Sequence, residues 1–468
     1  MKPVRSFLVF SAALLIGCGG SNTVTPPPET SPPIVDAAAV CGVDDSNDLF
    51  EGRLNAGTES FVLDSGLRVI LKQTPGNPVV AMRLFVPGGS MRLSEETAGI
   101  EDFALAVATR GGTQSWDKPA FSARLDSMGS GIGYSSALDY SVLSMNSLVV
   151  YLPDTWQLFH GVLSEPAFPL EEVERVREQK LQALLMREEN PDEQVVYIAR
   201  RLLFEGHPYS NSVEGVAETL SDFTADELRE YFLSILHPNE MLLVVVGDVS
   251  RDDLTALIGE TFEHMSPSDG EPPAVAPSFE ARETSMLVDQ ADIPTNYIIG
   301  LAAGPSPVAD DYAATVLALR HLSDRLFEEI RTERNLSYAV SSAIGRRMGN
   351  YLNFYITTEH PDQAIPVIYD EMRSLQDNLL TEQELTNLIR VFITRYYSDL
   401  DSNGAVAGEL GWWELYGGGR ENADRYIHDL EAVTPQDIQR AAERYLGGFQ
   451  VGVVGRPSEV SVELFQGP

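Results

Sequence analysis

The end of this chain repeats a pattern that first occurs near its middle. Thr224-Ala-Asp-Glu-Leu-Arg-Glu-Tyr leads to the apolar run Val244-Val-Val-Gly247, and Thr434-Pro-Gln-Asp-Ile-Gln-Arg-Ala leads to Val451-Gly-Val-Val-Gly455. The two copies start 210 residues apart. A spacing this long indicates a duplicated domain, because solenoid repeats recur every ~20 to 50 residues. The chain is therefore expected to fold as two similar domains of about 200 residues each.

Both halves mix strand and helix patterns. Predicted strands are short β-branched and apolar runs bounded by Gly or Pro, and predicted helices have apolar residues three to four positions apart. In the first half the patterns predict strands at 69–71, 79–86 and 241–246 and helices at 98–109, 171–189 and 224–235. In the second half they predict a strand at 297–302 and a helix at 311–333. This mixture indicates an α+β fold in each domain.

The first residues have the order of a secretory signal, with Lys2 and Arg5 ahead of the apolar run 7–16. The following Leu15-Ile16-Gly17-Cys18 resembles a bacterial lipobox, in which Cys18 carries the lipid anchor. The alternative is a plain signal peptide in which Cys18 is incidental. We predict a lipoprotein in the bacterial cell envelope, at the periplasmic face of the outer membrane, because no Asp retention cue follows the cysteine.

The remaining boundaries follow from composition. Residues 1–18 are the predicted signal, and the Pro/Ser/Thr-rich residues 19–58 are a predicted tether. Cys41 lies in this tether and has no partner if Cys18 is lipidated, so it is a free thiol, an intermolecular disulfide or an inert leftover. Prolines cluster again around 265–279, and the predicted divisions are a first domain at 59–264, a linker at 265–285 and a second domain at 286–468.

Charge and cysteine content exclude several classes of protein. The formal net charge is −36, which argues against nucleic-acid binding and against docking on an anionic membrane through protein charge. It fits cationic or neutral partners better, and among peptides it favours basic ones. Two cysteines are too few for a disulfide scaffold or a multi-thiolate zinc module. After the signal, no stretch reaches the ~18 apolar residues that a membrane helix needs.

Several short stretches together resemble one peptidase family. They are Gly88-Gly89-Ser90 with Ala98-Gly99-Ile100, Leu125-Asp126-Ser127-Met128-Gly129 with Asp139-Tyr140, Leu203-Phe204 with His207-Pro208-Tyr209 and Gly215, Val244-Val245-Val246-Gly247-Asp248, and Ile330 to Val340. Their order and spacing are similar to those of the insulinase/pitrilysin-like zinc peptidases, over roughly Phe61 to Pro457. The resemblance implies two homologous metallopeptidase-like α/β domains packed as a clamshell.

The family's catalytic motif is absent. Active members carry H-x-x-E-H on the helix predicted at 98–109: the two histidines and a downstream carboxylate hold zinc, and the glutamate between them is the general base. In the family register, Asp102 and Ala106 stand at the histidine positions, and Leu105 stands at the base position. The downstream ligand falls at Ala183 or its neighbour Gln182. The resemblance therefore implies a non-catalytic member with no zinc in this chain.

No other metal or catalytic motif replaces it. The seven histidines include no pair at ligand spacing on one helix, and H-E-x-x-H, C-x-x-C and G-x-S-x-G do not occur. His207 is expected to belong to a structural turn. Glu101 and Asp102 are expected to be helix-start carboxylates that complement the helix dipole.

The Arg/Tyr element of the family is retained. In active members an arginine and a tyrosine of the second domain bind the substrate backbone and stabilise the oxyanion, and Arg331 and Tyr338 stand at these positions. The alternative is that both serve packing. The resemblance implies a subunit that lends this pair to a zinc-bearing homologue in a heterodimer, with a peptide or unfolded polypeptide bound as an added strand. Two rival hypotheses remain: a non-enzymatic peptide-binding or assembly lipoprotein, and a self-sufficient zinc peptidase with a displaced site.

Overall fold

A computed structural model describes residues 54–271 and 274–466. The predicted signal, Cys18, Cys41 and the tether up to residue 53 lie outside the described residues. The last part of the predicted tether is folded, because Leu54 is buried and the backbone N–H groups of Leu54 and Asn55 both donate to the Asp424 carboxylate at 3.0 Å. Within the described ranges, no helix combines the length and the hydropathy that a membrane crossing requires.

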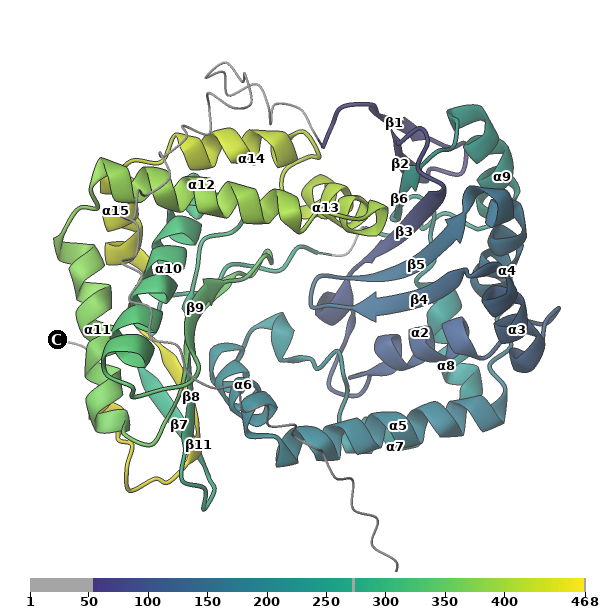
Figure 1. The fold of residues 1–468 in the computed structure, drawn as a ribbon. Helices are drawn as coiled ribbons and strands as arrows, with labels where there is room; N and C mark the ends of the chain where they lie inside the picture. The colour runs from purple at the N-terminus through teal and green to yellow at the C-terminus, as the bar shows by residue number, and fades with distance from the viewer. Residues whose placement is uncertain (1–53, 272–273, 467–468) are drawn as a thin grey trace, which may run out of the picture. The chain divides into compact units, whose positions relative to one another are not determined.

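Two sheets that share the same topology over five strands confirm the duplication, and the first sheet has β1 in addition (Figure 1). The first has the order β1-β2-β6-β3-β5-β4 and the second the order β7-β11-β8-β10-β9. The pairs β2–β6 and β7–β11 are parallel, and all other neighbours are antiparallel. The first-sheet strands are β1 Thr58–Val62, β2 Arg68–Gln73, β3 Val79–Pro87, β4 Gly131–Ser136, β5 Tyr140–Leu148 and β6 Leu242–Gly247. Those of the second are β7 Ser285–Gln290, β8 Asn296–Ala303, β9 Val340–Ile344, β10 Tyr351–Thr358 and β11 Gln450–Gly455.

Helices fill the connections between strands. In the first half they are α2 Ile100–Arg110, α3 Lys118–Met128, α4 Leu152–Ser164, α5 Leu170–Glu189, α6 Pro191–Leu203, α7 Ala217–Asp222, α8 Ala225–Ser234 and α9 Arg251–Glu263. In the second half they are α10 Tyr312–Leu326, α11 Pro361–Asp377, α12 Glu382–Ser398, α13 Asn403–Tyr416, α14 Asn422–Glu431 and α15 Pro435–Tyr445. The repeated Thr motifs are capping boxes: Thr224 pairs with Glu227 at α8, and Thr434 pairs with Asp437 at α15.

Two predicted helices differ in detail from those observed. The helix predicted at 311–333 is α-helical only to Leu326, and Phe327–Glu333 forms a π-helix (η5). The helix predicted at 171–189 ends as expected before Pro191, but a second helix, α6, starts there at once. Asn190 makes this break, because its side chain accepts a hydrogen bond from Asp192 N and caps α6.

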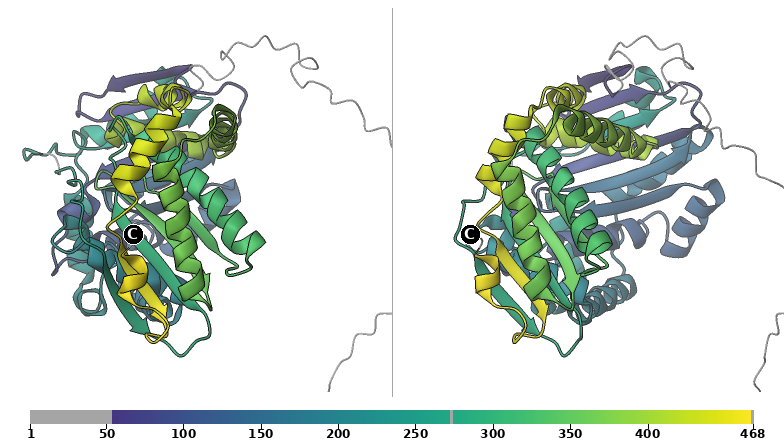
Figure 2. Two further views of the ribbon diagram at one scale, coloured as in Figure 1. Left: turned by 90° about the vertical axis from the view of Figure 1, so that its left-hand side faces the viewer. Right: turned by 60° about the vertical axis from the view of Figure 1, so that its left-hand side comes forward.

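The two halves exchange a helix. The helix α6 packs on β7, β8 and β11 of the second sheet, and α13 packs on β3 and β6 of the first (Figure 1). Gly452 permits the approach of α6, because an added Cβ there would lie 2.6 Å from the Val195 carbonyl oxygen. The remaining large helices of the second half, drawn in green, lie over its strands in both views of Figure 2. The exchanged helices thus cover the central strands of both sheets, and every residue of β6 and β11 is buried.

Candidate functional site

Two glycines set the start of the helix that carries the predicted site. Gly99 precedes α2 with a φ of 86°, and Gly215 in the loop beside it has a φ of 88°. An added Cβ on Gly99 would lie 2.5 Å from the Gly215 Cα. Both residues therefore need to be glycine, for the left-handed backbone and for the close approach. Gly99 and Gly215 both belong to stretches that resemble the family. Together they fix the start of α2 and therefore the position of Asp102 on it.

The degenerate zinc positions of α2 are one carboxylate and two apolar side chains. The Asp102 carboxylate pairs with the Lys180 ammonium of α5, and both side chains are mostly buried. Leu105 and Ala106 lie in the core between α2 and the first sheet. A lysine thus supplies the positive charge that faces Asp102, and the position expected for a general base is an inert side chain.

The third degenerate position lies in a pocket of about 460 Å³ beside this ion pair. Asp102, Lys180 and Ala183 line the pocket, and Gln182 is not among its lining residues. The geometry therefore brings Ala183, of the two candidates, to the same pocket as Asp102.

The donor set does not fit zinc. A catalytic zinc site needs three nitrogen, sulfur or oxygen ligands around an open position. Asp102 is the one such ligand at the family positions, and its charge is already balanced by Lys180. Among residues 54–271 and 274–466, no group of three or more His, Cys, Asp or Glu side chains could hold a metal ion. The side chains at the family positions therefore do not form a zinc site.

Glu101 lies in the first turn of α2, as expected for a helix-start carboxylate, but it is also buried. It is 1% exposed and accepts hydrogen bonds from Ser141 Oγ at 2.5 Å and Tyr231 OH at 2.8 Å. Burial raises the pKa of the Glu101 carboxyl, although both hydrogen bonds oppose the rise. The sequence carries no signal for this, because burial of the first turn of α2 depends on helix α8 and strand β5.

Replacing Glu101 with Gln is expected to stabilise the protein at about pH 7 relative to the wild type. The folded-state pKa lies above the unfolded value, so the wild type loses stability as the pH rises from about 4 through the folded pKa, and the variant does not. Urea unfolding of both proteins between about pH 4 and 7 measures this. A stability difference that stays constant over that range would contradict a raised pKa.

Arg331 and Tyr338 lie together on the surface of the second half. The Arg331 guanidinium lies 4.5 Å from the Tyr338 ring centroid and 4.7 Å from that of Phe327. Tyr338 is 81% exposed, so its hydroxyl is open to solvent. Arg331 belongs to the π-helix η5, a form that occurs often at functional sites. Neither residue lines the pocket that contains Asp102 and Ala183.

His207 has a structural role. Its Nδ1 accepts a hydrogen bond from Tyr209 N at 3.1 Å, and its Nε2 lies 3.0 Å from the Pro277 carbonyl oxygen. The neighbouring Tyr209 hydroxyl donates to the buried Asp139 carboxylate and accepts from Gly349 N at 3.2 Å. These stretches, which carried part of the resemblance, connect the first half to the β9–β10 loop of the second.

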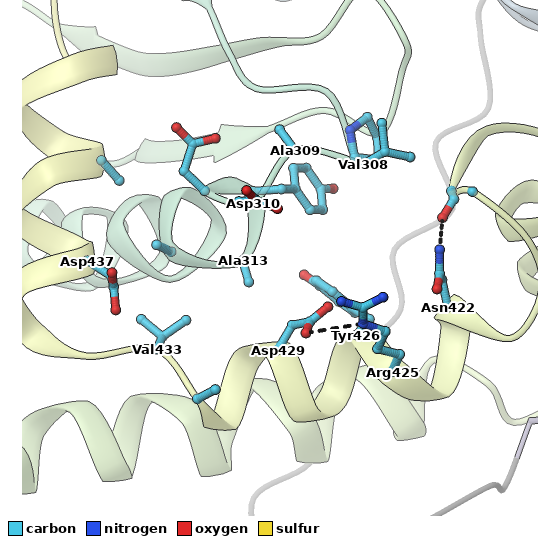
Figure 3. Close-up of a pocket in the computed structure, with 18 of the residues that line it drawn as sticks. Val308, Ala309, Asp310, Ala313, Asn422, Arg425, Tyr426, Asp429, Val433 and Asp437 are labelled. Carbon is cyan, nitrogen blue, oxygen red and sulfur yellow. Dashed lines mark hydrogen bonds and ion pairs between the residues drawn. The ribbon is translucent and has the colours of Figure 1, made fainter.

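A larger pocket of about 960 Å³ lies elsewhere, between the start of α10 and helices α14 and α15 (Figure 3). Its charged side chains are largely paired. Arg425 lies 3.7 Å from Asp429, Arg444 lies 2.8 Å from Asp311, and Arg440 pairs with Asp437. A dashed line in Figure 3 marks the Arg425–Asp429 pair. Neither Asp102 nor Arg331 lines it. This larger pocket is therefore separate from the residues that stand at the family's zinc and arginine positions.

Comparison with known families settles the relationship. A model described as "Insulinase (Peptidase family M16)" matches residues 68–216, and one described as "Peptidase M16 inactive domain" matches 222–392. This chain belongs to the insulinase family. The predicted family and the predicted two-domain α+β clamshell are confirmed.

Relatives of this insulinase-family protein include peptidases. An uncharacterized zinc protease of Streptomyces coelicolor is 22% identical over 414 residues, which are 85% of this chain and 90% of that protein. A probable mitochondrial-processing peptidase subunit beta of Schizosaccharomyces pombe is 20% identical over 415 residues, again 85% and 90%. The fold is shared with a peptidase M16 inactive domain from Pseudomonas fluorescens, at a TM-score of 0.75 and 21% identity, covering 85% of this chain and 98% of that one.

Proposed function

We propose that this chain is the non-catalytic subunit of a heterodimeric peptidase and pairs with a zinc-bearing homologue. The observation that carries the proposal is the Asp102–Lys180 ion pair, beside the buried Leu105 and Ala106, where active members hold zinc and the general base. Zinc and the base would then come from the partner. The relative named as an uncharacterized zinc protease supports peptide hydrolysis as the activity of such a pair.

In this proposal, Arg331 and Tyr338 reach the substrate held in the partner. Arginine keeps its charge at any working pH, and a phenol can donate to an oxyanion. The contact of the guanidinium with the Tyr338 ring holds the two donors side by side, and the exposure of Tyr338 leaves its hydroxyl available. The substrate is a peptide or unfolded polypeptide, and β4 at the edge of the first sheet offers a strand for it to pair with.

The proposed location is the cell envelope. A lipid on Cys18 would anchor the protein at the periplasmic face of the outer membrane, and the order of charged, apolar and Cys-containing segments at 1–18 supports this. Mass spectrometry of the protein purified from membranes, with Cys18→Ser as the control, tests the anchor.

The test of the subunit role uses the chain from residue 19 onward, without the anchor at Cys18, and a secreted homologue of the same organism with an intact H-x-x-E-H. We expect each protein alone to cleave an unfolded polypeptide poorly and the mixture to cleave it well. In the mixture, Arg331→Ala is expected to lower kcat about 100-fold, the usual effect of removing one oxyanion donor, and Tyr338→Phe about 10-fold or more. Complex formation, measured by size-exclusion chromatography, is expected to be unchanged by either variant.

Arg373→Ala is the matched control, because Arg373 is an exposed arginine of the same half that pairs with Asp370 at 3.3 Å. It is expected to leave kcat unchanged. If no such homologue binds the chain, the subunit proposal is wrong and the non-enzymatic peptide-binding or assembly lipoprotein becomes the better hypothesis. If the chain alone binds one zinc and cleaves peptides, it is a self-sufficient peptidase.

A further inference from the structure

The pocket beside the degenerate zinc positions has walls from three helices. Asp102 comes from α2, Lys180 and Arg187 come from α5, and Arg200 comes from α6. Apolar side chains complete it, including that of Val196. Its volume of about 460 Å³ is within the range of sites for small ligands, about 300–1,000 Å³.

The carboxylates that line this pocket all have hydrogen-bond donors or cations beside them. Asp102 pairs with Lys180, Glu214 with Arg187 at 3.2 Å, Asp192 with the Tyr355 hydroxyl, and Glu193 with Asn190 Nδ2 at 3.2 Å. None of them therefore needs an additional cation from a ligand.

The two guanidinium groups that line the pocket, in contrast, each have an N–H group without a hydrogen-bond acceptor. The Arg200 side chain makes no hydrogen bond or ion pair with any residue that the structure describes, and its Nε is buried. The Nε of Arg187 is also buried without an acceptor, and the Arg187 guanidinium lies 4.1 Å from the Tyr197 ring centroid, which fixes its plane. Both side chains line the pocket, and the Arg200 guanidinium has no acceptor among the described residues, so the pocket offers a cationic donor with which a ligand can pair.

We propose that this pocket binds a carboxylate of a peptide, with Arg200 as the main partner and Arg187 as the second. A planar carboxylate can accept two parallel N–H bonds from one guanidinium, which a neutral group does not match. The group comes from an Asp or Glu side chain or from the C-terminus of the peptide. The position that holds zinc in active relatives would then hold an acidic group of the bound chain.

This inference deepens the proposed function by naming a chemical feature of the peptide, but its test does not require the partner subunit. The net charge of −36 weakens long-range attraction of an acidic peptide. The expected selectivity therefore comes from contacts inside the pocket, where screening by salt is weak.

Three peptides of equal length, titrated calorimetrically into the chain from residue 19 onward, test the proposal. The first is Ac-Ala-Ala-Ala-amide, with no carboxylate; the second is Ac-Ala-Glu-Ala-amide, with a side-chain carboxylate; and the third is Ac-Ala-Ala-Ala-OH, with a terminal one. We expect at least one of the acidic peptides to bind about tenfold more tightly than the neutral one, as a charge-assisted pair would give. Which of the two binds more tightly identifies the source of the carboxylate.

Arg200→Gln is expected to abolish this preference, and Arg373→Gln, on the exposed face of α11, is expected to leave it intact. Equal binding of all three peptides by the wild type would overturn the proposal, and so would a preference that survives Arg200→Gln. The wild-type comparison decides even if Arg200→Gln fails to fold. A failure to find a partner subunit would leave this result unaffected, so the two proposals can fail separately.

Discussion

Replacing Gly411 with Ala is expected to lower the free energy of unfolding by about 2 kcal/mol. Gly411 lies in α13, and an added Cβ would fall well inside van der Waals distance of the Phe85 ring on β3. Phe85 is fully buried, so moving its ring aside disturbs the packing around it. Overpacking costs about 1–3 kcal/mol or more, and the better helix propensity of Ala returns up to about 1 kcal/mol.

Gly408→Ala is the matched control, since it lies three residues earlier in α13 and an added Cβ there meets no heavy atom within 4 Å. This change is expected to stabilise the protein by up to about 1 kcal/mol, through helix propensity alone. Urea unfolding of both variants measures the difference. Equal effects at the two positions would contradict the close contact between α13 and the first sheet.

The Gly411 contact also bears on cooperativity, because α13 belongs to the second half of the chain but covers the first sheet. Weakening that contact separates the two halves as well as loosening one of them. We therefore expect Gly411→Ala to broaden the unfolding transition or to split it in two. Such a result would mean that the exchanged helices α6 and α13 hold the two halves together, in addition to the Pro-rich segment at 265–285.

The sequence predicted the duplication and the ends of several helices because their signals are local. The capping boxes at Thr224 and Thr434 use residues three positions apart. The exchange of α6 and α13 was not predicted, because apolar periodicity shows that a helix has a buried face but not which sheet it covers. The Gly411–Phe85 and Gly452–Val195 contacts that decide this join residues distant in the sequence.

The candidate site, too, could be predicted from the sequence only in part. Comparison with the family motif was enough to place Asp102, Leu105 and Ala106 at degenerate positions. The partner of Asp102 could not be predicted in this way, because Lys180 lies 78 residues further along the chain. Burial of Glu101 and the missing acceptor for Arg200 also depend on helices that meet only in the folded protein. The roles assigned to Arg331 and Tyr338 stay predictions.

Glu409→Ala is the second change for which we expect a large loss, about 3 kcal/mol of unfolding free energy. Glu409 is 7% exposed in α13 and accepts from both Arg346 Nη atoms, at 2.6 and 3.0 Å. It also accepts from Tyr396 OH and Trp413 Nε1, each at 2.7 Å. The carboxylate thus ties α13 to α12 and to the β9–β10 loop, and its removal leaves the buried Trp413 N–H without an acceptor.

Removing one partner of a buried ion pair costs about 3–5 kcal/mol. Two features place the loss expected for Glu409→Ala at the lower end of this range. The Arg346 side chain is 40% exposed, so water can solvate it after the change, and its guanidinium keeps its place 3.9 Å from the Trp412 ring. Glu414→Ala is the matched control, because Glu414 pairs with the equally exposed Arg68 at 3.1 Å from the same helix. That pair lies nearer the surface, and we expect a loss of about 1 kcal/mol or less.

The pH dependence of the Glu409→Ala effect is the sharper test. Burial pushes the pKa of the Glu409 carboxyl up, but the Arg346 ion pair and the three sets of hydrogen bonds outweigh it and hold the pKa below its ordinary value. The stability from Glu409 is therefore fully present above the unfolded pKa of about 4.3 and is lost as the pH falls through the lower folded pKa. We expect the difference between wild type and variant to stay constant from about pH 7 to 5 and to shrink only below about pH 4. A difference that already shrinks between pH 7 and 5 would mean that burial dominates and that Arg346 does not hold the charge in place.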